Sequence, residues 1–218
     1  MRAFTIAIPR FPLCWKSIRS RLDDFLGCDK LLIRGVDTLN DGAGETENMD
    51  RLQLATLLSW SEDATIRGRK RLQKVVFFLQ QAGCPLGCRF TLHHFGPYSR
   101  DVADACDEMV AAGLVSETGG RSNGDPQYSY VLKPEIGLLL TQSPDESLTP
   151  FETLGRELIQ QDLWQLELGS TILFFHRQTH DWTDALQRGC DYKKVPPNQS
   201  RSQAALELAQ RVHSYATP

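Results

Sequence analysis

The sequence has no long apolar run, and this absence limits its class first. A membrane-spanning helix needs about 18 or more consecutive apolar residues, and no segment of the 218 residues approaches that length. The nearest run, Leu166 to Phe175, is shorter and is interrupted by Glu167 and by small and polar residues. It indicates a buried helix, and we expect a chain with no membrane partner.

An excess of basic over acidic side chains is also lacking. The chain has 24 basic and 27 acidic side chains and a formal net charge of -3 at pH 7. Basic residues are not in excess in residues 1–48, in residues 49–135 or in residues 136–218. Because nonspecific affinity for nucleic acid comes largely from phosphate neutralisation, this balance excludes a general polyanion binder. Any contact with DNA would come from a local patch.

The sequence carries neither a nucleophile elbow, nor a paired-cysteine redox motif, nor a dinucleotide fingerprint. Gly119, Gly120 and Gly124 do not follow a strand-to-helix turn, and they lack the Lys-Ser/Thr pair of a phosphate loop. We interpret them as the tip of a hairpin. The sequence therefore favours binding over catalysis, and it predicts no cofactor.

Two groups of residues resemble metal ligands. Cys84 and Cys88 precede His93 and His94, but adjacent residues of a strand point to opposite faces, so we expect packed thiols there. In the tail, His176 and His180 are four residues apart and would share one helix face, near two aspartates, Asp181 and Asp184. No third ligand can be named for the tail pair. A metal-dependent enzyme is therefore the least favoured hypothesis, and we predict no metal.

The first 48 residues differ from the rest. They contain no adequate secretory signal, since the apolar stretch AFTIAI is too short. The six cysteines of the chain are therefore expected to be free thiols in a cytoplasmic protein. Asn40 to Asn48 is a polar linker, and a helical pattern begins directly after it. We predict that residues 1–48 are a poorly ordered leader or a mis-assigned start, and that the folded protein begins at Met49.

From Met49 the apolar pattern becomes regular. Leu72, Val75, Val76 and Leu79 have the spacing of one helix face. We expect first a helix to about Trp60, then a polar loop, a helix over 69–82 and a short strand near 90–94. A turn at Gly96-Pro97 should follow, and then a helix that Ser99 caps and Gly113 ends. Two wing strands, Leu114-Val115 and Tyr128 to Leu132, with a loop between them, complete the order. This order predicts a winged helix-turn-helix-like domain over residues 49–135, mainly α with a small β-wing.

Residues 136–218 are predicted to form a helical C-terminal extension packed on that domain. Three apolar stripes at helical spacing support it. The stripe of the last helix contains Ala205, Leu208, Val212 and Tyr215. It either packs inside the chain or forms the seam of a homodimer, and the sequence leaves both open.

Two segments give the chain a family resemblance. GRKRLQKVVFFLQQAG and FGPYSRDVADACDEMVAAGLV, residues 68–83 and 95–115, resemble the YwgA-like family and, more distantly, the Panacea domain of SocA-like antitoxins. The resemblance covers about Leu52 to Leu132 and consists of a lysine-containing helix, an aromatic-Gly-Pro turn and a helix ending in Gly-Leu. It implies a winged-helix-like domain that acts by binding in antitoxin, defence or regulatory settings. It implies no catalytic residue.

The charge pattern separates two binding hypotheses. The helix after Ser99 exposes one base against four acids, which is unfavourable in a DNA groove. We therefore expect an antitoxin-like or defence-associated regulator that engages a protein partner; the alternative is a sequence-specific DNA-binding transcriptional regulator. The candidate partner- or nucleic-acid-binding residues are Arg67, Arg69, Lys70, Arg71, Lys74, Ser99, Arg100 and Arg121.

Overall fold

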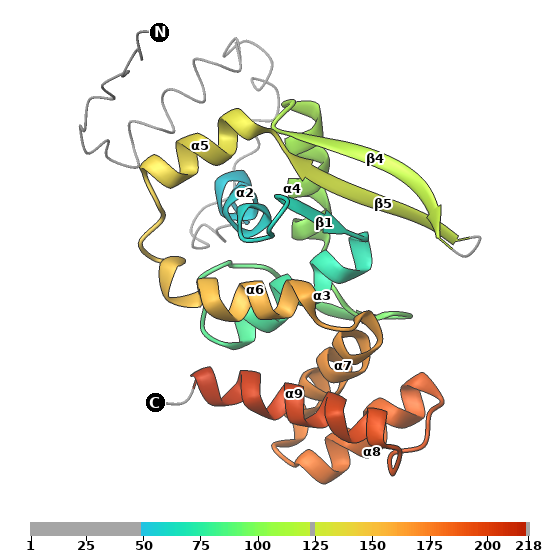
Figure 1. Cartoon of the computed structure of the whole chain (residues 1–218). Coiled ribbons are helices and arrows are strands. Elements are labelled where there is room, and N and C mark those ends of the chain that lie inside the picture. Colours follow the sequence, from blue (N-terminus) through green and yellow to red (C-terminus); the bar gives the residue numbers. More distant parts are fainter. Residues whose placement is uncertain (1–48, 123–124, 217–218) are drawn as a thin grey trace, which may run out of the picture.

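The computed structural model of the chain describes residues 49–122 and 125–216, without the side chains of residues 121–127. The predicted leader, residues 1–48, lies outside the described residues, and the predicted domain boundary at residue 135 stays a prediction. The described part is mainly helical with a small antiparallel sheet (Figure 1). This agrees with the predicted class at that level.

The first described helix, α2 (Arg51–Ser59), begins where the sequence indicates. The Asp50 carboxylate accepts a hydrogen bond from the Leu52 amide, and the side chain of Gln53 accepts one from the Asp50 amide. This capping box satisfies amide groups that a helix start otherwise leaves without partners. The segment after α2 was predicted to be a loop, which is wrong in part: Thr65–Arg67 forms strand β1.

Helix α3 (Arg69–Gln81) is the central element of the fold. Every side chain from Leu72 to Leu79 is buried, so the helix is enclosed well beyond its predicted stripe. It contacts β1, the strand β3 (Gly96–Tyr98) and three later helices, α6 (Glu152–Gln160), α7 (Leu163–Thr179) and α9 (Ser200–Ala216). A helix enclosed on several faces fixes the positions of the elements around it.

A short hairpin follows α3. Strand β2 (Thr91–His93) pairs antiparallel with β3, and His93 lies opposite Gly96. The predicted turn at Gly96-Pro97 is therefore wrong, because these residues belong to β3 and the chain reverses at His94 and Phe95. Helix α4 (Arg100–Ala111) buries Val102, Ala105, Cys106 and Met109 as expected, and Gly113 follows its end with φ of +67°.

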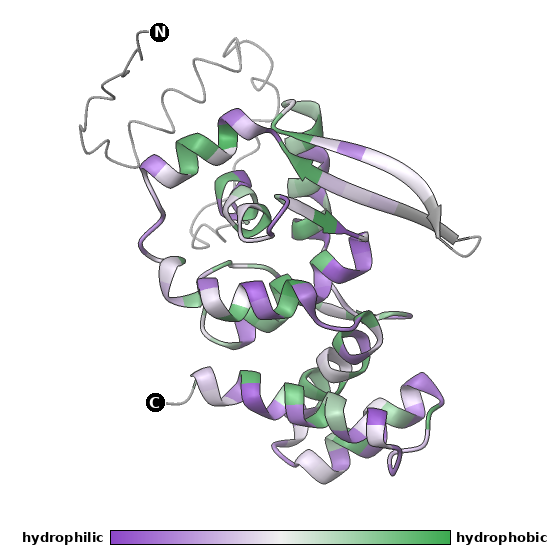
Figure 2. Ribbon diagram, viewed as in Figure 1, coloured by the Kyte–Doolittle hydropathy of each residue, from purple (hydrophilic) through white to green (hydrophobic). Residues whose placement is uncertain are grey.

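The sheet has the strand order β1-β5-β4. Strands β4 (Val115–Ser122) and β5 (Asp125–Leu132) form one long hairpin that projects from the body of the protein (Figure 1). The predicted loop between two short wing strands is thus largely strand, because pairing continues outward to Ser122 and Asp125. Figure 2 shows pale to hydrophilic colours along the projecting part of β4.

The remaining described chain is helical, as expected. It comprises α5 (Pro134–Gln142), the 3-10 turn η1 (Thr149–Phe151), α6 (Glu152–Gln160), α7 (Leu163–Thr179), α8 (Trp182–Lys193) and α9 (Ser200–Ala216). The stripe of the last helix packs inside the chain on α7, since Ala205, Leu208 and Val212 are buried, while Tyr215 is exposed. These three residues are therefore not available as a dimer seam.

Candidate functional site

The predicted basic cluster divides into an exposed and a buried part. Arg67, Arg69 and Lys70 are exposed around the N-terminus of α3, whereas Arg71 is half-buried and Lys74 is 2% exposed. These residues were predicted to form one solvent-facing group. The structure instead turns the later two toward the interior, because α3 is covered on several sides.

The two exposed arginines are already engaged by acids. Arg67 pairs with Asp63, and this hydrogen bond lowers the pKa of the Asp63 carboxyl. Arg69 donates to Glu117 of β4 at 2.7 Å, and its guanidinium lies 4.6 Å from the centre of the Tyr128 ring. Exposed pairs of this kind contribute little stability. They nevertheless reduce the positive charge that this surface presents to a phosphate.

Arg71 and Lys74 hold the fold together rather than face a partner. The Arg71 guanidinium donates to the carbonyl oxygens of Ile159 and Gln161 at the end of α6, the first at 2.9 Å. Lys74 Nζ donates to the Pro97 carbonyl oxygen at 2.5 Å. The prediction that both are surface contacts for a partner or for phosphate is therefore wrong.

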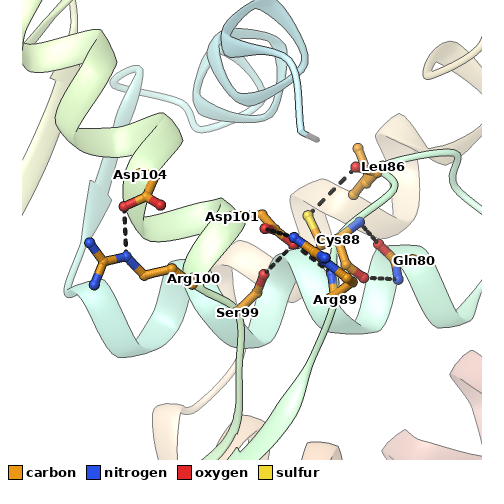
Figure 3. Close-up of polar contacts among 8 residues, drawn as sticks. All are labelled: Gln80, Leu86, Cys88, Arg89, Ser99, Arg100, Asp101 and Asp104. Atoms are coloured by element: carbon orange, nitrogen blue, oxygen red, sulfur yellow. Dashed lines mark hydrogen bonds and ion pairs between the residues drawn. The ribbon is translucent and has the colours of Figure 1, made fainter. Parts of the chain in front are cut away.

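Ser99 occupies the N-cap position of α4 but does not cap it. Its side chain is fully buried, and its hydroxyl lies 3.3 Å from an Asp101 carboxylate oxygen (Figure 3). Asp101 also accepts from the Arg89 amide at 2.7 Å. Ser99 is thus not accessible to a partner, which corrects its predicted role. Arg100 is exposed and paired with Asp104 at 2.8 Å (Figure 3). The side chain of Arg121 lies outside the described part.

Two buried polar contacts escaped the sequence reasoning. Gln73 and Gln80, seven residues apart on α3, each bond both backbone groups of one residue in the following segment. The Gln73 amide bonds the N–H and C=O of Ser99 at 2.8 and 2.9 Å, and the Gln80 amide bonds those of Cys88 at 2.7 and 2.8 Å. Each glutamine thereby satisfies a donor and an acceptor that an isolated segment would leave unpaired. The signal in the sequence that could have indicated these contacts is the presence of glutamines within an otherwise apolar helix.

Gly96 lets the hairpin approach the interior closely. Its φ is +95°, and a Cβ at this position would lie 2.6 Å from Thr171 Oγ1 and 3.6 Å from Lys74 Cε. Only glycine adopts this conformation readily. The lysine of α3 and the Gly-Pro pair of the sequence motif therefore meet at one contact, which attaches the β2–β3 hairpin to α3 and α7.

A pocket of about 440 Å³ opens beside this contact. Its walls come from α3, from the β2–β3 hairpin, from α4 and from Tyr130 of β5. Apolar side chains dominate the walls, and a few polar groups converge on them. Pockets of about 300–1,000 Å³ with this composition are the usual form of small-molecule sites.

Lys74 is the buried amine of this pocket, and its pKa is shifted. Burial lowers its pKa to about 7, and the nearby Glu167 carboxylate opposes that effect. Glu167 forms its own ion pair with Lys193 at 3.1 Å. At neutral pH a substantial fraction of the Lys74 amine is therefore uncharged.

The exposed face of α4 is acidic. Asp107 and Glu108 are exposed, and Asp104 neutralises the single arginine of the helix. Glu108 lies 3.8 Å from Arg51 of α2 in an exposed pair. A face of this charge repels phosphate and attracts a cationic surface.

The tail histidines do not form the predicted pair. α7 ends at Thr179 and His180 is its C-cap with φ of +54°, so the two histidines do not share a continuous helix face, although their ring centres lie 6.2 Å apart. His176 is buried and stacked 3.6 Å from Trp182, with the His213 ring 5.0 Å away. Burial lowers the pKa of His176. Asp181 accepts from the Thr183 amide at the start of α8, which engages that carboxylate locally.

The cysteines of the described part are buried free thiols. Burial raises the pKa of Cys84, Cys88 and Cys106 to about 12. Thiols with such pKa values are poor nucleophiles and poor metal ligands at neutral pH. Across residues 49–122 and 125–216, no three His, Cys, Asp or Glu side chains are grouped so that they could hold a metal ion.

None of the helices in the described ranges combines the length and the apolar character needed to cross a membrane. Fold and site together define a mainly helical protein with a small antiparallel sheet and an apolar pocket beside its central helix. The chain is 28% identical to the uncharacterized protein YwgA of Bacillus subtilis (strain 168) over 116 residues, which is 53% of this chain and 69% of that protein. No protein-family model matches the chain. The similarity supports the YwgA-like resemblance and assigns no activity.

Proposed function

We propose that the chain is a regulatory binding protein whose winged-helix domain engages a protein partner. The element order supports the winged helix: α2, β1 and α3 are followed, after the β2–β3 hairpin, by α4 and the β4–β5 hairpin, and β5 lies between β1 and β4. In a helix-turn-helix the second helix presents its exposed face to the target. In this chain that helix is α4.

The acidic face of α4 is the observation that favours a protein partner over DNA. Asp104 binds Arg100, Glu108 lies in an exposed pair with Arg51, and Asp107 adds exposed negative charge. A duplex carries one negative charge per about 1.7 Å of its axis, so this face would be repelled from a groove. A partner with a basic surface would instead gain complementary charge and a faster encounter. We therefore infer that α4 docks on a basic segment of another protein.

The cellular setting of the proposal comes from the resemblance. A YwgA-like chain that also resembles the Panacea domain of SocA-like antitoxins would act in the cytoplasm as an antitoxin-like or defence-associated regulator. The partner would be the protein whose activity or lifetime it controls. Two copies of the chain would suit such a regulator, although the last helix has its apolar stripe covered.

DNA binding is the second candidate, favoured by the exposed cations at the start of α3. Arg67, Arg69 and Lys70 lie at the base of the projecting hairpin, and the Gly68 N-cap leaves the first amides of α3 without a side-chain cap. Helix starts of this kind accept phosphate. Against this, Arg67 and Arg69 are paired with acids, and Lys74 and Ser99 are buried.

The test compares two charge reversals in the full chain. Asp107→Lys with Glu108→Lys changes the α4 face, and Glu146→Lys with Glu207→Lys adds the same charge at exposed positions on other elements. Partners are cross-linked in cells and identified by mass spectrometry, with the cross-linked residues mapped. We expect a partner cross-linked on α4 that the first variant loses and the second retains. Identical partner sets for both variants would contradict the proposal.

The DNA hypothesis has its own measurement. The full chain is titrated with its own upstream DNA at increasing salt, alongside Arg67→Glu with Lys70→Glu. Binding that weakens with salt and disappears in this variant would replace protein docking by DNA regulation. Arg71 and Lys74 are left unchanged, because their hydrogen bonds belong to the fold.

A further inference from the structure

The pocket beside α3 has apolar walls and a cationic side. Leu72 and Val102 contribute aliphatic surface, Phe95 and Tyr98 contribute rings, and Cys106 is a neutral thiol. Such walls accommodate the body of a small apolar molecule. They do not by themselves specify the polar end of that molecule.

The charged residues of the lining specify that end. Arg69, Lys70 and Lys74 line the pocket, against a single acid, Asp107. Arg69 is neutralised by Glu117, which leaves the two lysines as the cationic groups of the pocket: Lys70, and Lys74 in its protonated form. The Lys70 ammonium lies 3.4 Å from the centre of the Phe95 ring, and Phe95 is 44% exposed. Positive charge therefore extends from the rim to the interior.

Lys74 supplies the inner charge and lacks an anion. Its Nζ is hydrogen-bonded to the Pro97 carbonyl, and among the described residues no carboxylate lies within ion-pair distance of it. A buried ammonium is unfavourable unless an opposite charge pairs with it. Glu167, the carboxylate whose charge acts on Lys74, is held by Lys193 at 3.1 Å. A ligand anion would supply the missing partner.

We propose that this pocket binds a small monocarboxylate with an aliphatic or aromatic body, whose carboxylate faces Lys74 and Lys70 and whose body lies against Leu72, Val102 and Phe95. The proposal does not depend on the proposed function. Protein docking was placed on the exposed acids of α4, whereas this site lies beside α3 and the hairpin, and of the residues named for the two sites Asp107 belongs to both.

The probes are octanoate and 4-phenylbutyrate, titrated into the full chain by calorimetry. Octanol, which keeps the chain length and lacks the charge, is the matched probe. We expect saturable binding of at least one carboxylate with one site per chain. Because a hydrogen bond to a charged group contributes about 1.5–3 kcal/mol, octanol should bind at least about tenfold more weakly than octanoate.

Variants then locate the site. Lys74→Met should weaken carboxylate binding at least about tenfold, and Lys70→Met should weaken it severalfold, whereas Lys133→Met, at an exposed lysine outside the lining, should leave it within about twofold. Ala103→Leu keeps both charges and fills the pocket, so it should abolish binding. It also tests the site if Lys74→Met does not fold.

Three results would overturn the proposal: no saturable binding of either carboxylate at millimolar concentration, equal binding of octanol and octanoate, or full binding by folded Ala103→Leu. None of them bears on whether α4 docks on a protein. Conversely, unchanged partners after reversal of the α4 charges would refute the docking surface and leave the carboxylate site standing.

Discussion

One methyl group at Gly96 should disturb both the hairpin and its packing on α7. A Cβ there would lie 2.6 Å from Thr171 Oγ1 and 3.3 Å from the Glu167 carbonyl oxygen. The Thr171 hydroxyl already donates to that carbonyl at 2.7 Å and is fully buried, so it cannot move aside freely. Gly96→Ala therefore forces the hairpin away from α7 and lengthens the contact between Lys74 and Pro97.

Two glycines separate the causes of the loss. Gly68 has φ of +101° with nothing within 4 Å of its Cβ position, and Gly137 of α5 has open space and an ordinary helical backbone. A side chain at positive φ costs about 1–3 kcal/mol, which Gly68→Ala should show alone. Gly137→Ala should raise the free energy of unfolding by about 0.5–1 kcal/mol. Overpacking adds about 1–3 kcal/mol, so Gly96→Ala should lose about 2–6 kcal/mol.

Urea denaturation followed by circular dichroism measures the three changes on one scale. Domains are stable by only about 5–15 kcal/mol, so Gly96→Ala should leave a markedly weakened protein. A loss at Gly96 no larger than that at Gly68 would refute the close approach of the hairpin to α7. A loss at Gly137 would refute the helical geometry assigned to α5.

Three further predictions concern the interior. Gln73→Glu removes the amide that donates to the Ser99 carbonyl, so we expect the free energy of unfolding to fall by about 1–3 kcal/mol. Gln81→Glu, at the half-buried end of α3, should change it little. Equal losses in urea denaturation would contradict the Gln73 contact. The pKa of Lys74 is lowered to about 7 in the folded chain, so above pH 7 the unfolded chain binds more protons, and the free energy of unfolding should rise from pH 7 to 9 in the wild type and rise less in Lys74→Met. Above pH 9 the raised pKa values of the buried cysteines act in the opposite direction. A constant difference in stability between the two proteins from pH 7 to 9 would argue against a buried lysine. Buried thiols should resist maleimide in the native chain and react after unfolding, so mass spectrometry of the labelled peptides should find Cys84, Cys88, Cys106 and Cys190 protected, and rapid native labelling of any of them would contradict its burial.

The helices could be predicted because their information is local. α3 and α4 carry apolar residues at helical spacing, and Gly113 ends α4 in the conformation that glycine favours. β1 was missed because a three-residue strand is defined by its partner: Thr65–Arg67 is a strand through its pairing with β5, far along the chain. The long hairpin was underestimated because pairing overrides the weak strand propensity of Gly119 and Gly120.

The candidate residues failed for a different reason. Charge indicates exposure only on average, since lysine is rarely buried. Lys74 is an exception that the sequence did signal: Phe77 and Phe78 follow it by three and four residues, which places large apolar side chains on its own face of α3. Gln73 was missed because the sequence analysis considered only the apolar stripe and the basic residues of this helix. Both errors come from treating α3 as a helix with one buried face, when it is surrounded.

These corrections change what the family resemblance implies. The resemblance rests on a lysine-containing helix and an aromatic-Gly-Pro turn, and in the structure Lys74, Gly96 and Pro97 form one contact that attaches the hairpin to α3. Residues with such a role explain a common fold and say little about a target. Function should therefore be sought in the residues outside that contact: the exposed acids of α4, and the pocket wall that Lys74 shares with Lys70 and Phe95. Relatives that keep the lysine, glycine and proline of this contact but differ in the acids of α4 and in the pocket wall should differ in what they bind. Their stability should nevertheless fall in the same way when the glycine equivalent to Gly96 is replaced.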